Sequence, residues 1–162
     1  MKEIEFIQEY LNRYKKSLLE NDISDSMIAM KKILLQTCNK GNKVLIAGNG
    51  GSAAMASHVS VDFTKAVGIR AVNFNEADLV TCFANDYGYE QWVARALDFY
   101  ADPGDLAILI SSSGKSPNMV NGAQQAIKMG LSLITLSGFF PENPLRKLGN
   151  INMWVSSQEY NI

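Results

Sequence analysis

The chain has 162 residues, of which 47% are apolar and 19% are charged, a composition typical of one globular domain. Its 15 basic and 16 acidic residues give a formal net charge of -1, which argues against a nucleic-acid binder. No apolar run approaches the roughly 20 residues of a membrane span, and the amino terminus lacks the apolar centre of a signal peptide.

Two helices are predicted at the start of the chain. Apolar residues at helical spacing indicate a helix over 3–19, and a second helix is expected from about Ser26 to Asn39, with Ser24 or Asp25 as its N-cap. A small α/β domain offers this pair no obvious docking surface. Residues 1–40 are therefore expected to serve self-association into a homo-oligomer.

After Gly41, short apolar runs alternate with amphipathic stretches. Apolar strands between helices are typical of a parallel sheet covered on both faces, so residues 41–162 are predicted to form an α/β domain with a doubly wound five-stranded parallel sheet. The expected strands lie at 43–48, 69–75, 105–111, 131–137 and 151–157, and the expected helices at 52–66, 78–100, 116–129 and 142–149. Cys38 and Cys82 lack metal-site or redox spacing and are expected to be buried thiols in a reducing cytoplasm.

The first turn that could bind a ligand is GNGGS at 48–52, between a strand and a helix. Glycine lets a ligand approach the backbone closely, and the start of the following helix attracts anions. The turn matches neither a Walker loop nor a dinucleotide-binding loop, since Ala53 stands where the last glycine of the latter belongs. A tight strand-to-helix turn with Ser52 as the N-cap is the alternative interpretation.

The second turn is SSSGKSPN at 111–118, after the third expected strand. Hydroxyls and N–H groups at a helix start, which Pro117 favours, can hold a phosphate monoester without a metal. An ordinary polar loop is the alternative. Because the carboxyl ends of strands line the ligand crevice of such a sheet, the two turns together predict a small phosphorylated ligand, to which Lys115 could add charge.

Two further pairs of residues are candidates for the site. His58, the one histidine of the chain, precedes Asp62 by four residues, so both lie on one helical face. That spacing suits a metal site or a base with a partner, although a structural histidine beside a carboxylate is commoner. Asn85 and Asp86 either form a turn that starts a helix or reach a neighbouring site.

These features, in this order, resemble the SIS (sugar isomerase) superfamily, whose domain is flavodoxin-like. Within it they are similar to the phosphoheptose isomerase family, which interconverts sedoheptulose 7-phosphate and glycero-manno-heptose 7-phosphate. The resemblance runs from about Lys43 to Val155, and the leading helices are similar to the hairpin through which members form tetramers. It rests on GNGGSAA with His58, NDYGYE at 85–90, ISSSGKSPN at 110–118 and LITLSG at 133–138.

The resemblance implies a role for each matching residue. His58 falls on a position that binds zinc in many members, and Asp62 falls where the family has a glutamate that is both zinc ligand and catalytic carboxylate. The phosphate would be held by four serines, Ser111, Ser112, Ser113 and Ser116. The rest of the substrate would contact the first turn and the Asn-Asp pair, at Asn49, Gly50, Gly51, Ser52, Asn85 and Asp86.

The sequence departs from the family pattern at three points. Asp62 is one methylene shorter than the family's glutamate, and Lys115 replaces an asparagine. The family also continues past its fifth strand into a helix whose glutamine and histidine complete the metal site and the acid–base pair. Because this sequence ends at Ile162, we expect a longer natural chain, so that the domain lacks its C-terminal helix here. A lineage that lost the chemistry is the alternative.

The expected function is that of a phosphosugar aldose–ketose isomerase, most readily for sedoheptulose 7-phosphate, by proton transfer through an enediol with Asp62 as the base. The alternative is a non-catalytic SIS protein, either a phosphosugar-binding regulator or an oligomeric adaptor. By resemblance we expect zinc, a homo-tetramer or dimer and a cytoplasmic location, with no nucleic-acid or membrane partner. A generic nucleotide-binding domain is disfavoured by the loop spacings.

Overall fold

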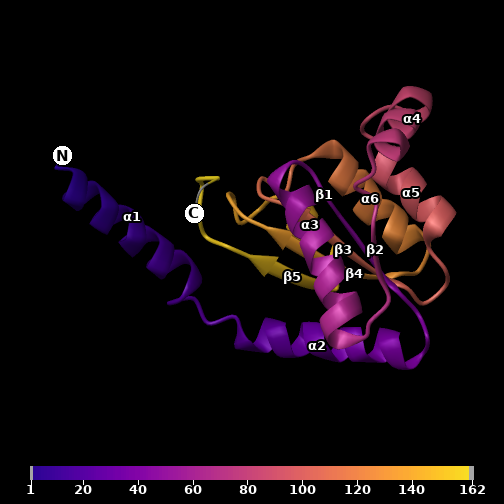
Figure 1. Ribbon diagram of the computed structural model, residues 1–162, viewed down its shortest axis with the longest axis horizontal. Coiled ribbons are helices and arrows are strands. Elements are labelled where there is room, and N and C mark those ends of the chain that lie inside the picture. The colour runs from indigo at the N-terminus through magenta and orange to yellow at the C-terminus, as the bar shows by residue number, and fades with distance from the viewer. Residues whose placement is uncertain (1, 161–162) are drawn as a thin grey trace.

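A five-stranded sheet forms the centre of the computed structural model, which describes residues 2–160 (Figure 1). Every pairing is parallel and the strand order is β2-β1-β3-β4-β5, the flavodoxin-like order. The predicted α/β fold with a doubly wound parallel sheet is therefore confirmed. The strands are β1 (Val44–Gly48), β2 (Ala71–Asn73), β3 (Leu106–Ser111), β4 (Ser132–Ser137) and β5 (Ile151–Trp154).

Helices cover both faces of the sheet, and the sheet separates the core into two layers. Leu45 and Ala47 of β1 pack toward α5 (Trp92–Tyr100) and α6 (Pro117–Lys128). Val44 and Ile46, which alternate with them, belong to the opposite cluster with residues of α2 (Ser24–Asn39) and α3 (Gly51–Asp62). Burial on both sides explains why the strands are continuous apolar runs in the sequence.

Three of the predicted helical stretches differ from the structure. The stretch at 78–100 is two helices, α4 (Ala77–Tyr87) and α5, because Gly88 at φ 88° breaks the path between them. At 142–149 there is only a 3₁₀ turn at Leu145–Lys147. The helix expected at 52–66 ends as α3 at Asp62 and continues as the short π-helical segment η1 (Phe63–Val67).

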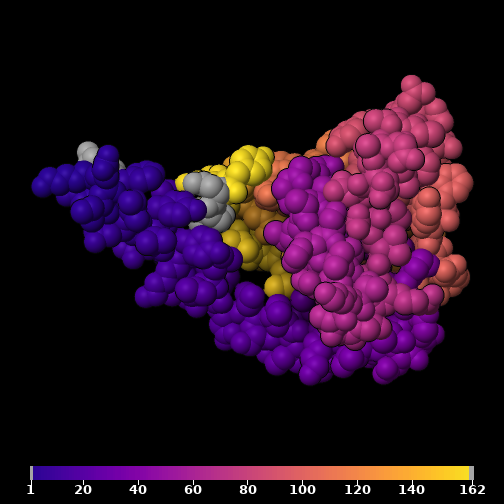
Figure 2. All heavy atoms as spheres, in the orientation of Figure 1, coloured from indigo at the N-terminus to yellow at the C-terminus, as the bar shows by residue number. Residues whose placement is uncertain are grey.

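The two N-terminal helices have different relations to the core. Helix α1 (Glu3–Leu18) projects away from the body and buries none of its residues (Figures 1 and 2). Helix α2 places Leu34 in the cluster that contains Val44 and Ile46, so the expectation that neither helix has a docking surface is wrong for α2. The helices do not lie side by side as a closed hairpin. The predicted N-cap, Ser24 or Asp25, is also wrong, because α2 already begins at Ser24 and its N-cap residue is Ile23.

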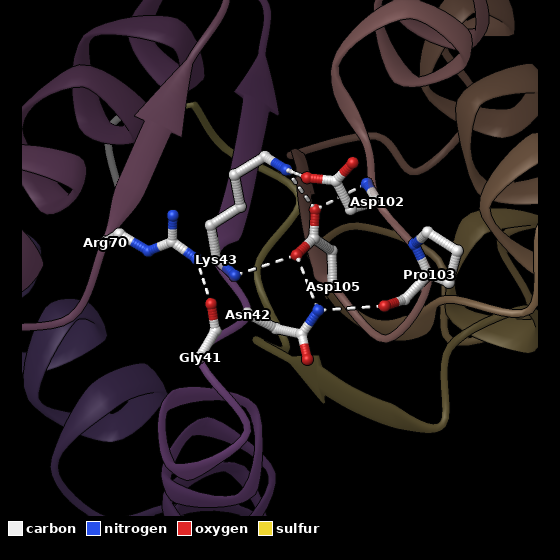
Figure 3. A network of polar contacts seen from close by, with 7 residues as sticks. All are labelled: Gly41, Asn42, Lys43, Arg70, Asp102, Pro103 and Asp105. Atoms are coloured by element: carbon white, nitrogen blue, oxygen red, sulfur yellow. Dashed lines mark hydrogen bonds and ion pairs between the residues drawn. The ribbon is translucent and has the colours of Figure 1, made fainter.

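Polar side chains tie together the amino-terminal ends of β1 and β3 (Figure 3). The buried Asp105 carboxylate accepts hydrogen bonds from the Lys43 N–H at 2.8 Å, the Lys43 Nζ at 2.6 Å and the Asp102 N–H at 2.8 Å. Burial opposes the charge of Asp105, but these donors outweigh it and hold the pKa of the carboxyl below its usual value. Burial likewise opposes the charge of Lys43, whose pKa is nevertheless raised by the two carboxylates.

The cysteines agree only in part with the sequence prediction. Cys38 is partly buried against the core, but Cys82 is exposed because it lies on the outer side of α4, so its predicted burial is wrong. Among residues 2–160, no helix combines the length and apolar character needed to cross a membrane.

Candidate functional site

The two polar turns meet at the carboxyl-terminal edge of the sheet, around a pocket of about 140 Å³. The first turn follows β1 and the second follows β3, its neighbour in the sheet, which is why turns so far apart in sequence lie together. The pocket is lined by Asn49, Ser52, Ile110, Ser111, Ser112, Ser113, Ser116 and Tyr160. The structure thus brings six of the predicted substrate-binding side chains to one cavity.

The first turn is shaped by two glycines. Gly50 adopts φ 52° before α3, a conformation that favours glycine, and the helix begins at Gly51. Ser52 therefore lies in the first helical turn, and its predicted role as N-cap is wrong. A Cβ on Gly48 would lie 2.6 Å from the Ser52 carbonyl oxygen, so β1 and α3 meet more closely than a side chain allows. This contact brings the start of α3 to the pocket.

The second turn arranges its hydroxyls through bonds within the turn. Ser116 precedes α6 as its N-cap residue, and its Oγ lies 3.3 Å from Ser111 Oγ. Ser113 Oγ accepts the Lys115 N–H at 3.2 Å. Because a hydroxyl carries one donor and two acceptor positions, Ser113 keeps its O–H for a ligand. The turn is therefore fixed in shape while it retains donors for an anion.

A buried asparagine, Asn143, packs against the second turn at Gly114. Asn143 Nδ2 donates to Ser137 Oγ at 3.1 Å and to the Phe140 carbonyl at 2.9 Å. A Cβ on Gly114, at φ 61°, would lie 1.9 Å from Asn143 Oδ1, so only glycine fits there. Sequence reasoning missed Asn143, which lies in a loop after β4 with no local pattern that marks it.

A pair of asparagines links the two turns directly. Asn49 and Asn118 exchange two hydrogen bonds, at 3.0 Å and 2.8 Å, and Tyr89 donates its hydroxyl to Asn49 Oδ1 at 3.2 Å. Asn118 and Tyr89 were not predicted as site residues. Both lie inside motifs that the sequence had marked, SSSGKSPN and NDYGYE, and this position was the available signal.

The side chains that line the pocket carry no formal charge. Lys115, which could have supplied one, instead places its Nζ over the Phe140 ring, 4.6 Å from the centroid. Attraction for an anion therefore comes from hydroxyls, an amide and the starts of α3 and α6, which carry partial positive charge.

Asn85 and Asp86 lie apart from the pocket lining. They stand at the end of α4, where both are exposed, and Asn85 Nδ2 donates to Asp86 Oδ1 at 2.9 Å. Within one chain, the part of their segment that reaches the site is Tyr89.

His58 and Asp62 lie together on α3 but outside the pocket lining. Their Nε2 and Oδ2 atoms are 3.6 Å apart, and their side chains are 80% and 59% exposed. Zinc in proteins ordinarily takes three or four protein ligands. Within residues 2–160, no group of three His, Cys, Asp or Glu side chains could hold a metal, so the donor set of one chain does not by itself fit zinc.

A wider apolar groove of about 390 Å³ adjoins the serine pocket and shares four lining residues with it, Ser52, Ile110, Ser112 and Tyr160. Its wall includes Met55, which lies one helical turn before His58 on α3. Since a helix rises about 1.5 Å per residue, His58 lies roughly 9 Å along α3 from Ser52. A ligand anchored at the serines and extended along α3 would point toward the half of the helix that carries His58 and Asp62.

The sequence is similar to those of known proteins. The SIS domain family model matches residues 5–138. The chain is 35% identical over 137 residues to a phosphoheptose isomerase of Chlorobaculum parvum, covering 80% of this chain and 65% of that protein. It is also 35% identical over 134 residues to one of Aliarcobacter butzleri, covering 79% and 70%.

The fold agrees in the same way. A phosphoheptose isomerase structure from Francisella tularensis superposes with a TM-score of 0.89 at 23% identity, over 98% of this chain and 88% of that one. The chain spans slightly less than two thirds of the length of the Chlorobaculum parvum relative.

Proposed function

Because this chain belongs to the SIS domain family, and within it to the phosphoheptose isomerase family, we propose that it binds a phosphorylated sugar and interconverts its aldose and ketose forms. The observation that carries the proposal is the 140 Å³ pocket in which the GNGGS turn and the serine turn converge. The substrate we propose is sedoheptulose 7-phosphate, the ketose substrate of the family.

The serine pocket would bind the phosphate and so fix one end of the sugar. Hydroxyl donors are suited to phosphate oxygens, and hydrogen bonds to a charged acceptor are stronger than neutral ones. Binding energy gained there orients the reacting carbons at the other end, which lowers the entropic part of the barrier.

The reacting end of the sugar would lie near Asp62. Isomerisation of the ketose removes a proton from C1, forms an enediol and returns a proton to C2, while O1 loses its hydroxyl proton and the former carbonyl oxygen O2 gains one. We propose that the Asp62 carboxylate takes the C1 proton and delivers it to C2. His58, 3.6 Å from that carboxylate, would orient it.

Zinc at His58 and Asp62 remains a proposal that needs ligands beyond these two side chains. A bound zinc ion would supply polarisation of the sugar oxygens. Isothermal titration with zinc, repeated on His58→Ala, tests the site without any activity readout. The described residues of one chain do not complete the coordination of such an ion.

Self-association and a cytoplasmic location belong to the same proposal. Ile4, Ile7 and Leu11 form one stripe on α1 and are 70%, 54% and 56% exposed. An apolar stripe on a projecting helix supports a homo-oligomer, tetramer or dimer, in which a second copy covers it. Sedimentation of the wild type and of Leu11→Glu tests this, with a lower mass expected for the variant.

A phosphosugar-binding protein without catalysis is the second candidate. The observation that favours it is the separation between the serine pocket and the His58–Asp62 pair, since neither residue lines the pocket. Such a protein would retain affinity for sugar phosphates and leave the carbon-bound protons in place.

Proton exchange separates the two candidates. Sedoheptulose 7-phosphate is incubated with the protein in heavy water, and loss of the C1 proton signal is followed by NMR, with Asp62→Asn as the control. Exchange that the variant abolishes supports the isomerase. Saturable binding without exchange supports the binding protein, and absence of binding contradicts both.

A further inference from the structure

Asn49 is held by two residues that were not predicted to belong to the site. Its Oδ1 accepts the Asn118 Nδ2–H at 2.8 Å and the Tyr89 hydroxyl at 3.2 Å, while its Nδ2 donates to Asn118 Oδ1 at 3.0 Å. These bonds connect three segments: the turn after β1, the start of α6 and the connection between α4 and α5.

A backbone donor fixes which way both amides point. The Met119 N–H can only donate, and it lies 3.0 Å from the buried Asn118 side-chain atom that must therefore be Oδ1. Nδ2 of Asn118 then faces Asn49 and requires an acceptor, which makes the facing atom of Asn49 its Oδ1. The Tyr89 hydroxyl adds a second donor to the same oxygen.

The remaining hydrogen-bonding capacity of Asn49 is one N–H. A carboxamide has two N–H donors and an oxygen with two lone pairs. Both lone pairs and one N–H are used by Asn118 and Tyr89, and the second N–H has no acceptor among the described residues. Since Asn49 lines the serine pocket, that N–H is available to a ligand there.

We propose that Tyr89 and Asn118 are positioning residues that make Asn49 a hydrogen-bond donor to the anion in the serine pocket. The opposite orientation would turn the Asn49 oxygen toward the phosphate oxygens, where two acceptors repel each other. The proposal rests on the proposed function, because it takes the ligand to be phosphorylated. It also gives the NDYGYE segment a role at the site through Tyr89.

Tyr89→Phe tests the proposal because it removes one hydroxyl from a side chain that is 54% exposed, so the fold should be retained. Tyr87→Phe is the matched control, since Tyr87 lies in the same segment at the end of α4 and packs its ring against Arg95. We expect Tyr89→Phe to bind sedoheptulose 7-phosphate roughly 3–10-fold more weakly, the range for loss of one hydrogen bond, and Tyr87→Phe to bind as the wild type does.

The Asn49 side-chain amide supplies a readout that a change in general stability would not move. In protein labelled with ¹⁵N-asparagine, one of the two Asn49 Nδ2–H signals should shift when sedoheptulose 7-phosphate is added. In Tyr89→Phe both signals should already be displaced without ligand, and the ligand-induced shift should be smaller. Wild-type affinity together with unchanged Asn49 signals in Tyr89→Phe would overturn the proposal.

Failure of the proposed function would look different. If the wild type binds no sedoheptulose 7-phosphate, the proposed function fails, whereas the ligand-free spectra still decide the positioning role. Displaced Asn49 signals in ligand-free Tyr89→Phe would then support that role, and undisplaced signals would overturn it.

Discussion

The two edges of the sheet use their polar side chains in opposite ways. At the amino-terminal edge the Asp105 carboxylate accepts bonds from Lys43 and Asp102, so its capacity is taken up within the fold (Figure 3). At the carboxyl-terminal edge the hydroxyls and the Asn49 amide are held by a few bonds and keep donors directed at a cavity. The first edge therefore serves stability, and the second is arranged for a ligand.

The largest expected effect comes from breaking the amino-terminal edge. Asp105→Ala removes the buried carboxylate that accepts four hydrogen bonds, and it leaves the backbone N–H groups of Lys43 and Asp102 without their acceptor. Removing one partner of a buried ion pair destabilises by about 3–5 kcal/mol. Urea unfolding followed by circular dichroism measures the loss.

Asp102→Asn is the control for that experiment. The Asp102 side chain is 77% exposed, so loss of its ion pair with Lys43 should change the unfolding free energy by less than about 1 kcal/mol. If Asp105→Ala and Asp102→Asn destabilise equally, the buried network does not have the role given to it here.

The second effect tests the opposite edge. Ser113→Ala combined with Ser116→Ala should weaken sugar-phosphate binding by at least about tenfold, because each lost bond to a charged acceptor is worth roughly 1.5–3 kcal/mol. The unfolding free energy should change little, since both side chains line a cavity and not the core. Calorimetric titration with sedoheptulose 7-phosphate measures the affinity, and an unchanged value would contradict the phosphate site.

Acid should act on the amino-terminal edge. Because the pKa of Asp105 in the folded state lies below its ordinary value of 3.8, its stabilisation is present above that value and is lost as the pH falls through the folded pKa. Lys43 stays protonated throughout this acid range, since the two carboxylates raise its pKa above 10.5, so the change comes from protonation of Asp105 and the loss of its pairing with Lys43.

Comparison with Asp105→Ala isolates that acid response. Between about pH 5 and pH 3, the unfolding free energy of the wild type should fall more steeply than that of the variant. Equal slopes in urea titrations over this range would mean that other carboxylates account for the acid sensitivity.

The strands and the two turns could be predicted because their signal lies in consecutive residues. Apolar runs indicated all five strands, and the glycines and serines of the two turns indicated an anion site because their chemistry is contained in a few consecutive residues. The four-residue spacing of His58 and Asp62 also predicted correctly that both lie on one face of a helix, where their side chains are 3.6 Å apart. It could not say that the pair lies outside the pocket, since spacing relates residues to one another and not to the sheet.

What the sequence missed depends on partners distant in the chain. Asn49 and Asn118 are 69 positions apart, and Gly114 requires the space beside Asn143, which only the folded loop reveals. Asp105 was predicted only as the first residue of a strand, because nothing in the sequence places Lys43 beside it.

The smallest expected effect concerns Lys115, the cation nearest in sequence to the serines. Its ammonium lies over the Phe140 ring and does not line the pocket, so Lys115→Met, which keeps much of the packing, should remove only a cation–π contact worth about 0.5–1 kcal/mol. Affinity for sedoheptulose 7-phosphate should then change by less than about threefold, since 1.4 kcal/mol corresponds to a tenfold change. Titration of both proteins at low and high salt measures this. The contrary result is that Lys115→Met loses as much affinity as the serine variant, with the loss smaller at high salt. That result would mean that Lys115 leaves the Phe140 ring to bind the ligand. The carboxyl-terminal edge would then recognise its anion by charge as well as by neutral donors.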